Sequence, residues 1–133
     1  MPPELEMSLR LLLAAALGAA IGVQREILGK PAGLRTHMLI AIGAAMFTVI
    51  SIYGFIGAVD PSRVAAGVVA GVGFLGAGAI IFRSQEGYVT GLTTAATIWV
   101  TAGIGMAAGS GLYIASAVVT ALALAVLFIP HIK

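Results

Sequence analysis

Residues 24–37, QREILGKPAGLRTH, contain many of the side chains in this sequence that could do chemistry. The chain has only seven basic and five acidic residues, yet Arg25, Glu26, Lys30 and Arg35 all lie here with His37 beside them. An ionisable group at the mouth of a membrane span is a functional candidate by default. The alternative is that the cations set topology, Glu26 and Lys30 form a surface pair, and Pro31–Gly33 form a turn. Both interpretations stay open at this point.

A second polar segment is GLTTAATIWVTAG, residues 91–103. Thr94, Thr97 and Thr101 recur at i, i+3 and i+7, which places them on one helical face, with Thr93 beside them. Their hydroxyls could bond back to their own helix or join neighbouring helices. They could equally line a polar pathway, and the spacing does not separate these two uses.

Several classes of chemistry are excluded or disfavoured. The chain has no cysteine, and no nucleophile-base set, paired carboxylates or histidine pair at metal spacing, so we expect no enzyme. We expect no nucleic-acid partner, because the few cations are scattered. We also expect no cofactor. Mg²⁺ as a ligand or a transported ion needs oxygen ligands, usually carboxylates. Glu26 lies at a span end and is the one candidate, through a ring formed by an oligomer.

The elements that must position these residues are membrane helices. The sequence is 60% hydrophobic and 9% charged, with a mean hydropathy of +1.11. Apolar runs long enough to cross about 30 Å of hydrocarbon repeat along it. The sequence therefore predicts an all-α integral membrane protein, with residues 1–133 as a single transmembrane domain. The five predicted spans are 7–23, 37–58, 64–82, 91–109 and 111–129, with Asp60 as an N-cap before the third.

The orientation follows from the distribution of cations. Five of them, Arg25, Lys30, Arg35, Arg83 and Lys133, fall on one side of the five predicted spans, and Arg10 and Arg63 fall on the other. This bias predicts an outside N-terminus and a cytoplasmic C-terminus.

An internal repeat is also visible. A shift of 58 residues aligns Leu17–Ala19 with Leu75–Ala77, Arg25 with Arg83, and GLRT at 33–36 with GLTT at 91–94. We interpret this as a parallel duplication of a two-helix unit followed by a fifth helix. Glycines at G-x-x-x-G spacing, which let helices approach closely, predict a homo-oligomer or tight internal packing. These pairs are Gly18/Gly22, Gly67/Gly71 and Gly105/Gly109.

The stretches QREILGKPAGLRTH, DPSRVAAGVVAGVGFLGAGAII and GLTTAATIWVTAGIGMAAG closely resemble the membrane domain of the MgtC/SapB family, over about residues 11–129. The family commonly has Glu-Arg-Glu where this sequence has Gln24-Arg25-Glu26, so a role based on an acidic pair there is in doubt. Many members carry a further soluble C-terminal domain. The motif residues that the resemblance implies are Arg25, Glu26, Gly33, Leu34, Arg35, Thr36, His37, Asp60, Arg63, Gly73, Phe74, Gly76, Thr93, Thr94 and Trp99, to which the threonine face adds Thr97.

The resemblance implies a bacterial inner-membrane protein linked to adaptation to low magnesium and, in some members, to virulence. Some members are thought to contact membrane partners such as ATP synthase, and the family is often described as transporting magnesium. Because no carboxylate lies inside a predicted span, we favour regulation through a partner. The alternative is a Mg²⁺ transporter or channel built from an oligomer.

Overall fold

The computed structural model of the chain describes residues 3–83 and 91–130, apart from the side chains of residues 81–83. Within these residues it is all helical, as predicted, with five helices and no strand. The helices are α1 (Pro3–Ile27), α2 (Leu34–Tyr53), α3 (Ser62–Arg83), α4 (Leu92–Gly109) and α5 (Tyr113–Leu127).

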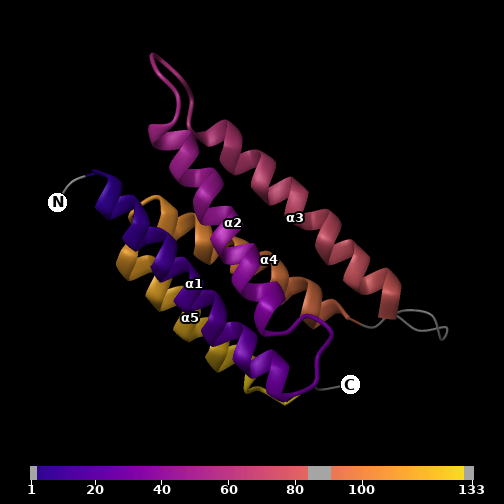
Figure 1. Ribbon diagram of the computed structural model, residues 1–133. Helices are drawn as coiled ribbons and strands as arrows, with labels where there is room; N and C mark the ends of the chain where they lie inside the picture. The colour runs from indigo at the N-terminus through magenta and orange to yellow at the C-terminus, as the bar shows by residue number, and fades with distance from the viewer. Residues whose placement is uncertain (1–2, 84–90, 131–133) are drawn as a thin grey trace.

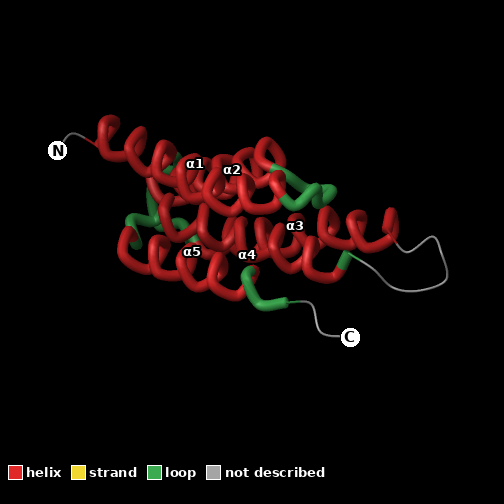
Figure 2. Tube along the Cα trace, turned by 90° about the horizontal axis from the view of Figure 1, so that it is seen from below, coloured by secondary structure: helices red, strands yellow, loops and turns green. Residues whose placement is uncertain are grey.

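The helices run up and down in two layers. Figure 1 shows them roughly aligned along one long axis, and Figure 2 shows α1 and α2 lying over a row formed by α5, α4 and α3. Helix α4 contacts all four other helices and is the centre of the bundle. We call the end where α1 starts and α2 finishes the Arg10 end, and the end where α1 finishes and α2 and α4 start the Arg25 end.

Four of the five helices, α1 to α4, are long and apolar enough to cross a membrane. Helix α5 is apolar but has 15 residues, which corresponds to about 22 Å at 1.5 Å per residue. It lies inside the fifth predicted span, 111–129, and is two residues shorter at each end. Gly111 takes a left-handed backbone with φ of +86° in the tight turn that precedes α5.

The second predicted span, 37–58, is wrong at its C-terminal end. Helix α2 ends at Tyr53 and Gly54 caps it, donating its backbone N–H to the Ile50 carbonyl. Phe55 and the fully exposed Ile56 follow as a loop, although their side chains continue the apolar run. Hydropathy alone misplaced this boundary because it does not register the helix stop.

Glycine lets the central helices approach closely. A β-carbon built on Gly105 would overlap the backbone carbonyl oxygen of Ala41, and one on Gly109 would lie 2.6 Å from that of Ala45. On α1, a β-carbon on Gly18 would lie 2.8 Å from the Ala41 side chain. Helices α1 and α4 therefore both meet α2 backbone to backbone, and the fully buried alanines Ala41 and Ala45 form the core between them.

The internal repeat stays a prediction. One contact recurs under the 58-residue shift, because Gly18 faces the carbonyl of His37 and Gly76 faces that of Ala95, at 2.9 and 3.6 Å from a built β-carbon. The side chain of Arg83, which would correspond to Arg25, lies outside the described residues.

The glycine contacts generate a matched pair of variants. Gly105→Ala places a methyl group against the α2 backbone, and overpacking of this kind costs about 1–3 kcal/mol. Gly103→Ala, two residues away, places the same methyl group in open space. We expect Gly105→Ala to lower the free energy of unfolding and Gly103→Ala to leave it unchanged or raise it by up to about 1 kcal/mol, because alanine favours the helix. Reversible unfolding in detergent measures both, and equal effects would contradict the contact.

Candidate functional site

Five buried polar side chains from three helices gather toward the Arg25 end and in the middle of the bundle. We call them the polar strip: Arg25 on α1, His37 on α2, and Thr94, Thr97 and Thr101 on α4. The chain brings Arg25 and Thr94, 69 positions apart, into contact because α1, α2 and α4 are mutual neighbours. The strip unites the charged stretch with the threonine face, which the sequence could present only as separate motifs.

Arg25 is the one charged member of the strip. Its side chain is buried, with 3% of the residue exposed, and its Nη2 donates a hydrogen bond to Thr94 Oγ1 at 3.1 Å. Its buried Nε has no hydrogen-bond partner among the described residues. Among the described residues no carboxylate pairs with it, since the one ion pair found there joins Glu6 and Arg10. A guanidinium in this environment carries a high desolvation cost with little compensation.

His37 is fully buried beside this charge. Its Nδ1 lies 2.9 Å from the Gly33 carbonyl oxygen. A carbonyl can only accept, so Nδ1 carries the proton of this bond, and in the neutral ring Nε2 is left as an acceptor. That Nε2 is buried without a partner in the described part of the chain. The imidazole therefore presents a free lone pair to the bundle interior.

The three threonines of the strip differ in the hydrogen bonds that their hydroxyls form. Thr97 Oγ1 donates to the Thr93 carbonyl at 2.6 Å, which satisfies it within its own helix. Thr94 is taken by Arg25. Thr101 is fully buried and its Oγ1 has no described partner. Of the three strip threonines, Thr101 is thus the one whose hydroxyl is uncommitted within the described part of the chain.

Glu26 lies outside the strip. It is exposed, and its Oε1 accepts the backbone N–H of Leu34 at 3.0 Å, which caps the start of α2. A β-carbon on Gly33 would overlap this carboxylate, so the glycine makes room for the cap. The surface pair of Glu26 with Lys30, one of the two interpretations left open by the sequence, is not found among the described residues, where the carboxylate bonds the start of α2 instead.

The remaining predicted residues are spread over the surface. Asp60 is exposed and accepts the backbone N–H of Ser62 at 3.0 Å and its hydroxyl at 2.7 Å, which confirms it as a cap for α3 and lowers its pKa below the ordinary value. Trp99 is 59% exposed on the face of α4 away from the strip. Gly76 is buried against Ala95, whereas the others are exposed and not brought to the strip: Arg35, Thr36, Arg63, Gly73, Phe74 and Thr93.

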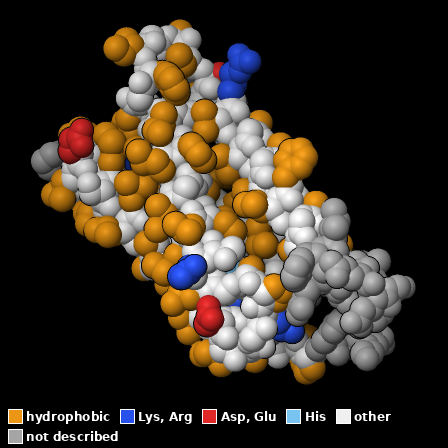
Figure 3. Space-filling view, turned by 45° about the vertical axis from the view of Figure 1, so that its right-hand side comes forward, with side chains coloured by type: hydrophobic (Ala, Val, Ile, Leu, Met, Phe, Trp, Pro, Cys, Tyr) orange, Lys and Arg blue, Asp and Glu red, His pale blue; other side chains and the backbone are white. Residues whose placement is uncertain are grey.

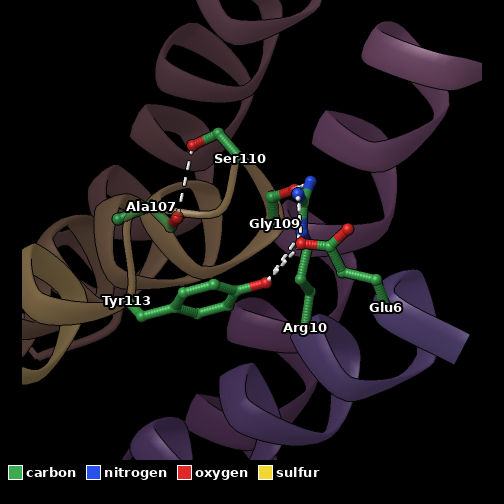
Figure 4. Close-up of polar contacts among 6 residues, drawn as sticks. All are labelled: Glu6, Arg10, Ala107, Gly109, Ser110 and Tyr113. Carbon is green, nitrogen blue, oxygen red and sulfur yellow. Dashed lines mark hydrogen bonds and ion pairs between the residues drawn. The ribbon is translucent and has the colours of Figure 1, made fainter. Parts of the chain in front are cut away.

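Sequence reasoning missed a network around Arg10 at the opposite end. Figure 4 shows its guanidinium between Glu6, Tyr113 and the Gly109 carbonyl, at 3.1, 3.2 and 3.0 Å. Tyr113 also donates to Glu6 at 3.0 Å, and the guanidinium stacks 5.4 Å from the centre of the Tyr53 ring. The i, i+4 spacing of Glu6 and Arg10 was the available signal. This network fixes the start of α1 to the α4–α5 turn.

The two buried arginines form a natural comparison. Arg10→Met leaves the Gly109 carbonyl without its donor and removes the cation beside Glu6, to which Tyr113 still donates, and we expect the free energy of unfolding to fall by about 1–3 kcal/mol. Arg25→Met removes an uncompensated charge, and Thr94 can bond back to its own helix as Thr97 does. We expect its free energy of unfolding to stay unchanged or rise by about 1–3 kcal/mol. Unfolding in detergent checks both, and a comparable loss in Arg25→Met would show that Arg25 has a strong partner.

Comparison with known proteins assigns the chain to a family. A model of the MgtC family matches residues 11–132. A protein named putative magnesium transporter YhiD, from Escherichia coli (strain K12), is 55% identical over 115 residues, covering 81% of this chain and 53% of that protein. Protein MgtC of Brucella abortus (strain 2308) is 49% identical over 114 residues, covering 85% and 46%. Protein SapB of Bacillus subtilis (strain 168) is 42% identical over 115 residues, covering 81% and 49%.

No solved structure matches the chain. The chain spans about half the length of the curated relatives just described. The family match nevertheless covers all but the first ten residues and the last one, and it includes the whole polar strip. Together with the apolar helices, this shows an integral membrane protein, and the chain belongs to the MgtC family.

Proposed function

We propose that this chain is a regulatory protein of the bacterial inner membrane that acts in magnesium homeostasis through a membrane partner and does not itself carry Mg²⁺. The link to magnesium is supported by the name of the YhiD relative. The observation that favours regulation over transport is the buried Arg25. This residue lies in the polar strip, which is the polar route that the bundle offers to an ion.

A permanent cation in the strip opposes the passage of another cation. A divalent ion about 6 Å from one positive charge is repelled by about 5.5 kcal/mol at an effective dielectric constant of 20. That repulsion adds to the cost of removing water from Mg²⁺, which dehydrates reluctantly. A pathway past Arg25 within one protomer would therefore be slow unless an anion compensated both charges.

The strip also lacks the ligands that Mg²⁺ uses. In the part of the chain that the structure describes, no group of three or more His, Cys, Asp or Glu side chains is placed to hold a metal ion. The oxygens of Thr94 and Thr97 are committed to Arg25 and to their own helix. Glu26 is committed to the α2 N-terminus. Mg²⁺ as a ligand of one protomer has little support.

The Arg25 end offers a surface for a partner. Glu26, Lys30, Arg35 and Thr36 are exposed there around the entrance to α2. In our proposal the cation bias places this end in the cytoplasm, with the N-terminus outside and the C-terminus inside. ATP synthase is the partner to test first, on the resemblance to family members thought to contact it. Charged residues around such a surface select the partner and speed its approach.

Transport by an oligomer is the second candidate. The specific observation in its favour is the set of uncommitted oxygens inside the bundle, namely Thr101 Oγ1 and the buried Oε1 of Gln24. Several copies could also bring exposed Glu26 carboxylates into a ring at the entrance. Transport by an oligomer requires the Glu26 carboxylate to leave the cap of α2. The effect of a Glu26 substitution on Mg²⁺ flux therefore distinguishes transport from regulation.

Mg²⁺ flux separates the two candidates. Purified protein in proteoliposomes is expected to give no uptake above empty vesicles, and Glu26→Ala or Thr97→Val is expected to change nothing. The readout is an internal Mg²⁺-sensitive dye, with circular dichroism and protease accessibility showing that the protein is folded and inserted. Saturable uptake that Glu26→Ala abolishes would overturn regulation in favour of transport.

Growth in low magnesium tests the partner surface. In a bacterium lacking its own copy, we expect Arg35→Glu to lose most of the growth that the wild-type chain restores, because the reversal repels the partner without touching the buried core. Glu4→Lys, which reverses an exposed charge at the Arg10 end, is the matched control and should retain growth. Equal growth of both variants at equal protein levels would remove this surface from the mechanism.

A further inference from the structure

The three G-x-x-x-G pairs of the sequence pack differently in the structure. Gly18 and Gly22 on α1 press against α2, with built β-carbons 2.8 Å from Ala41 and 2.7 Å from Leu34. Gly105 and Gly109 on α4 press against α2 in the same way. Gly67 and Gly71 on α3 have no atom within 4 Å of a built β-carbon. Two pairs are thus packed inside the protomer, and the third meets no atom of the residues that the structure describes.

The third pair lines an apolar groove between α2 and α3. The groove has a volume of about 550 Å³, and its floor combines Gly43 and Phe47 of α2 with Gly67, Val68 and Gly71 of α3. None of the described residues that line it is charged. Figure 3 shows hydrophobic and uncoloured atoms over the middle of the molecule, with charged side chains toward its ends. The groove is therefore suited to an apolar helix lying within the membrane.

Helix α3 is the least covered of the spanning helices. Only 11% of its apolar window is buried, compared with 28% to 50% for α1, α2 and α4. It meets α4 along one side and α2 only to a small extent. Helix association in a bilayer depends on close packing, since lipid removes the hydrophobic drive. A second helix on Gly67 and Gly71 would give α3 the close contact that it lacks in the protomer.

The charges at the end of the groove specify the occupant. Arg63 precedes Gly67 and Gly71 at i, i+4 and i+8, so it continues their stripe beyond the apolar zone. Asp60 lies three residues before it, ionised at neutral pH because the Ser62 bonds stabilise its carboxylate. Both are exposed, and neither forms an ion pair with another described residue. The stripe therefore carries one charge of each sign at the same end.

We propose that the groove is occupied by α3 of a second copy of this chain, related by a two-fold axis along the membrane normal. Copies inserted in the same orientation make the two α3 helices parallel, with each glycine pair against the other. A two-fold axis brings identical positions together, so the two charged ends lie side by side and the long Arg63 side chain of each protomer reaches Asp60 of its partner, twice. An acyl chain would fill the groove but would leave these charges unmatched. This interface is independent of the proposed regulatory function.

Disulfide formation in membranes tests the contact directly. The chain has no cysteine, so Gly71→Cys introduces a single thiol. Disulfides need Cα atoms about 4.4–6.8 Å apart, which a close helix crossing supplies. We expect oxidation to convert most of Gly71→Cys to a covalent dimer. Gly103→Cys is the matched control on another open helix face, and it should stay monomeric.

Fluorescence transfer between labelled protomers in vesicles tests the wild-type interface without a disulfide. At increasing lipid-to-protein ratios, the wild type and Gly103→Leu should keep transfer well above the random level. Gly67→Leu/Gly71→Leu should lower it to that level, because the leucines fill the groove while meeting no atom at the β-carbon. Transfer that the double variant retains, or a wild type that is monomeric throughout, overturns the proposal.

Charge reversal checks the parallel two-fold arrangement. Arg63→Asp and Asp60→Arg should each weaken dimerisation about tenfold or more, because each places like charges together at both sites. The double variant Asp60→Arg/Arg63→Asp should recover most of the lost affinity. Failure to recover, with helix content intact, would show that these two residues do not meet across the interface, and the arrangement would be rejected. Occupation by a lipid or another protein would leave all these variants alike.

Discussion

The close backbone approach of α4 to α2 is the constraint on which the rest of the structure depends. Gly105 and Gly109 meet the carbonyls of Ala41 and Ala45 with no side chain between them. This contact makes α4 the central helix and turns its threonine face inward. The same register of α4 brings Thr94 beside Arg25. The glycine contacts therefore also determine where the polar strip lies. Since helices in lipid gain little from burying apolar surface, such contacts carry much of the stability.

The two buried arginines show that the same residue type has different roles in one bundle. Arg10 has a carboxylate, a phenol, a carbonyl and an aromatic face around it, and its charge is used to join three segments. Arg25 has one hydroxyl, and its Nε and the neighbouring His37 Nε2 have no described partner. A fully satisfied network adds rigidity and specificity. A poorly satisfied one lowers stability and persists where it serves a function, which is why Arg25, and not the better connected Arg10, is our functional candidate.

The sequence predicted the helices, the cap at Asp60 and a shared helical face for the three threonines, because hydropathy, capping residues and helical spacing are local properties. It misplaced the end of α2, since Phe55 and Ile56 are apolar but follow the stop at Gly54. It did not find the Arg25–Thr94 bond, whose partners are 69 residues apart, or the bond from Leu34 to Glu26. These depend on which helices become neighbours, and neither composition nor period specifies that.

The polar strip and the α3 groove lie on different sides of α2, and this separation bears on the mechanism. The strip is enclosed by α1, α2 and α4, whereas the groove opens between α2 and α3. A dimer formed through α3 would therefore leave the strip inside each protomer and the exposed charges of the Arg25 end free for a partner. It would bring no carboxylate to the strip, because the groove contains none. Dimerisation in this form would consequently supply no Mg²⁺ ligands to the strip, and it agrees with two copies of the proposed regulatory surface better than with one shared pore through the strip.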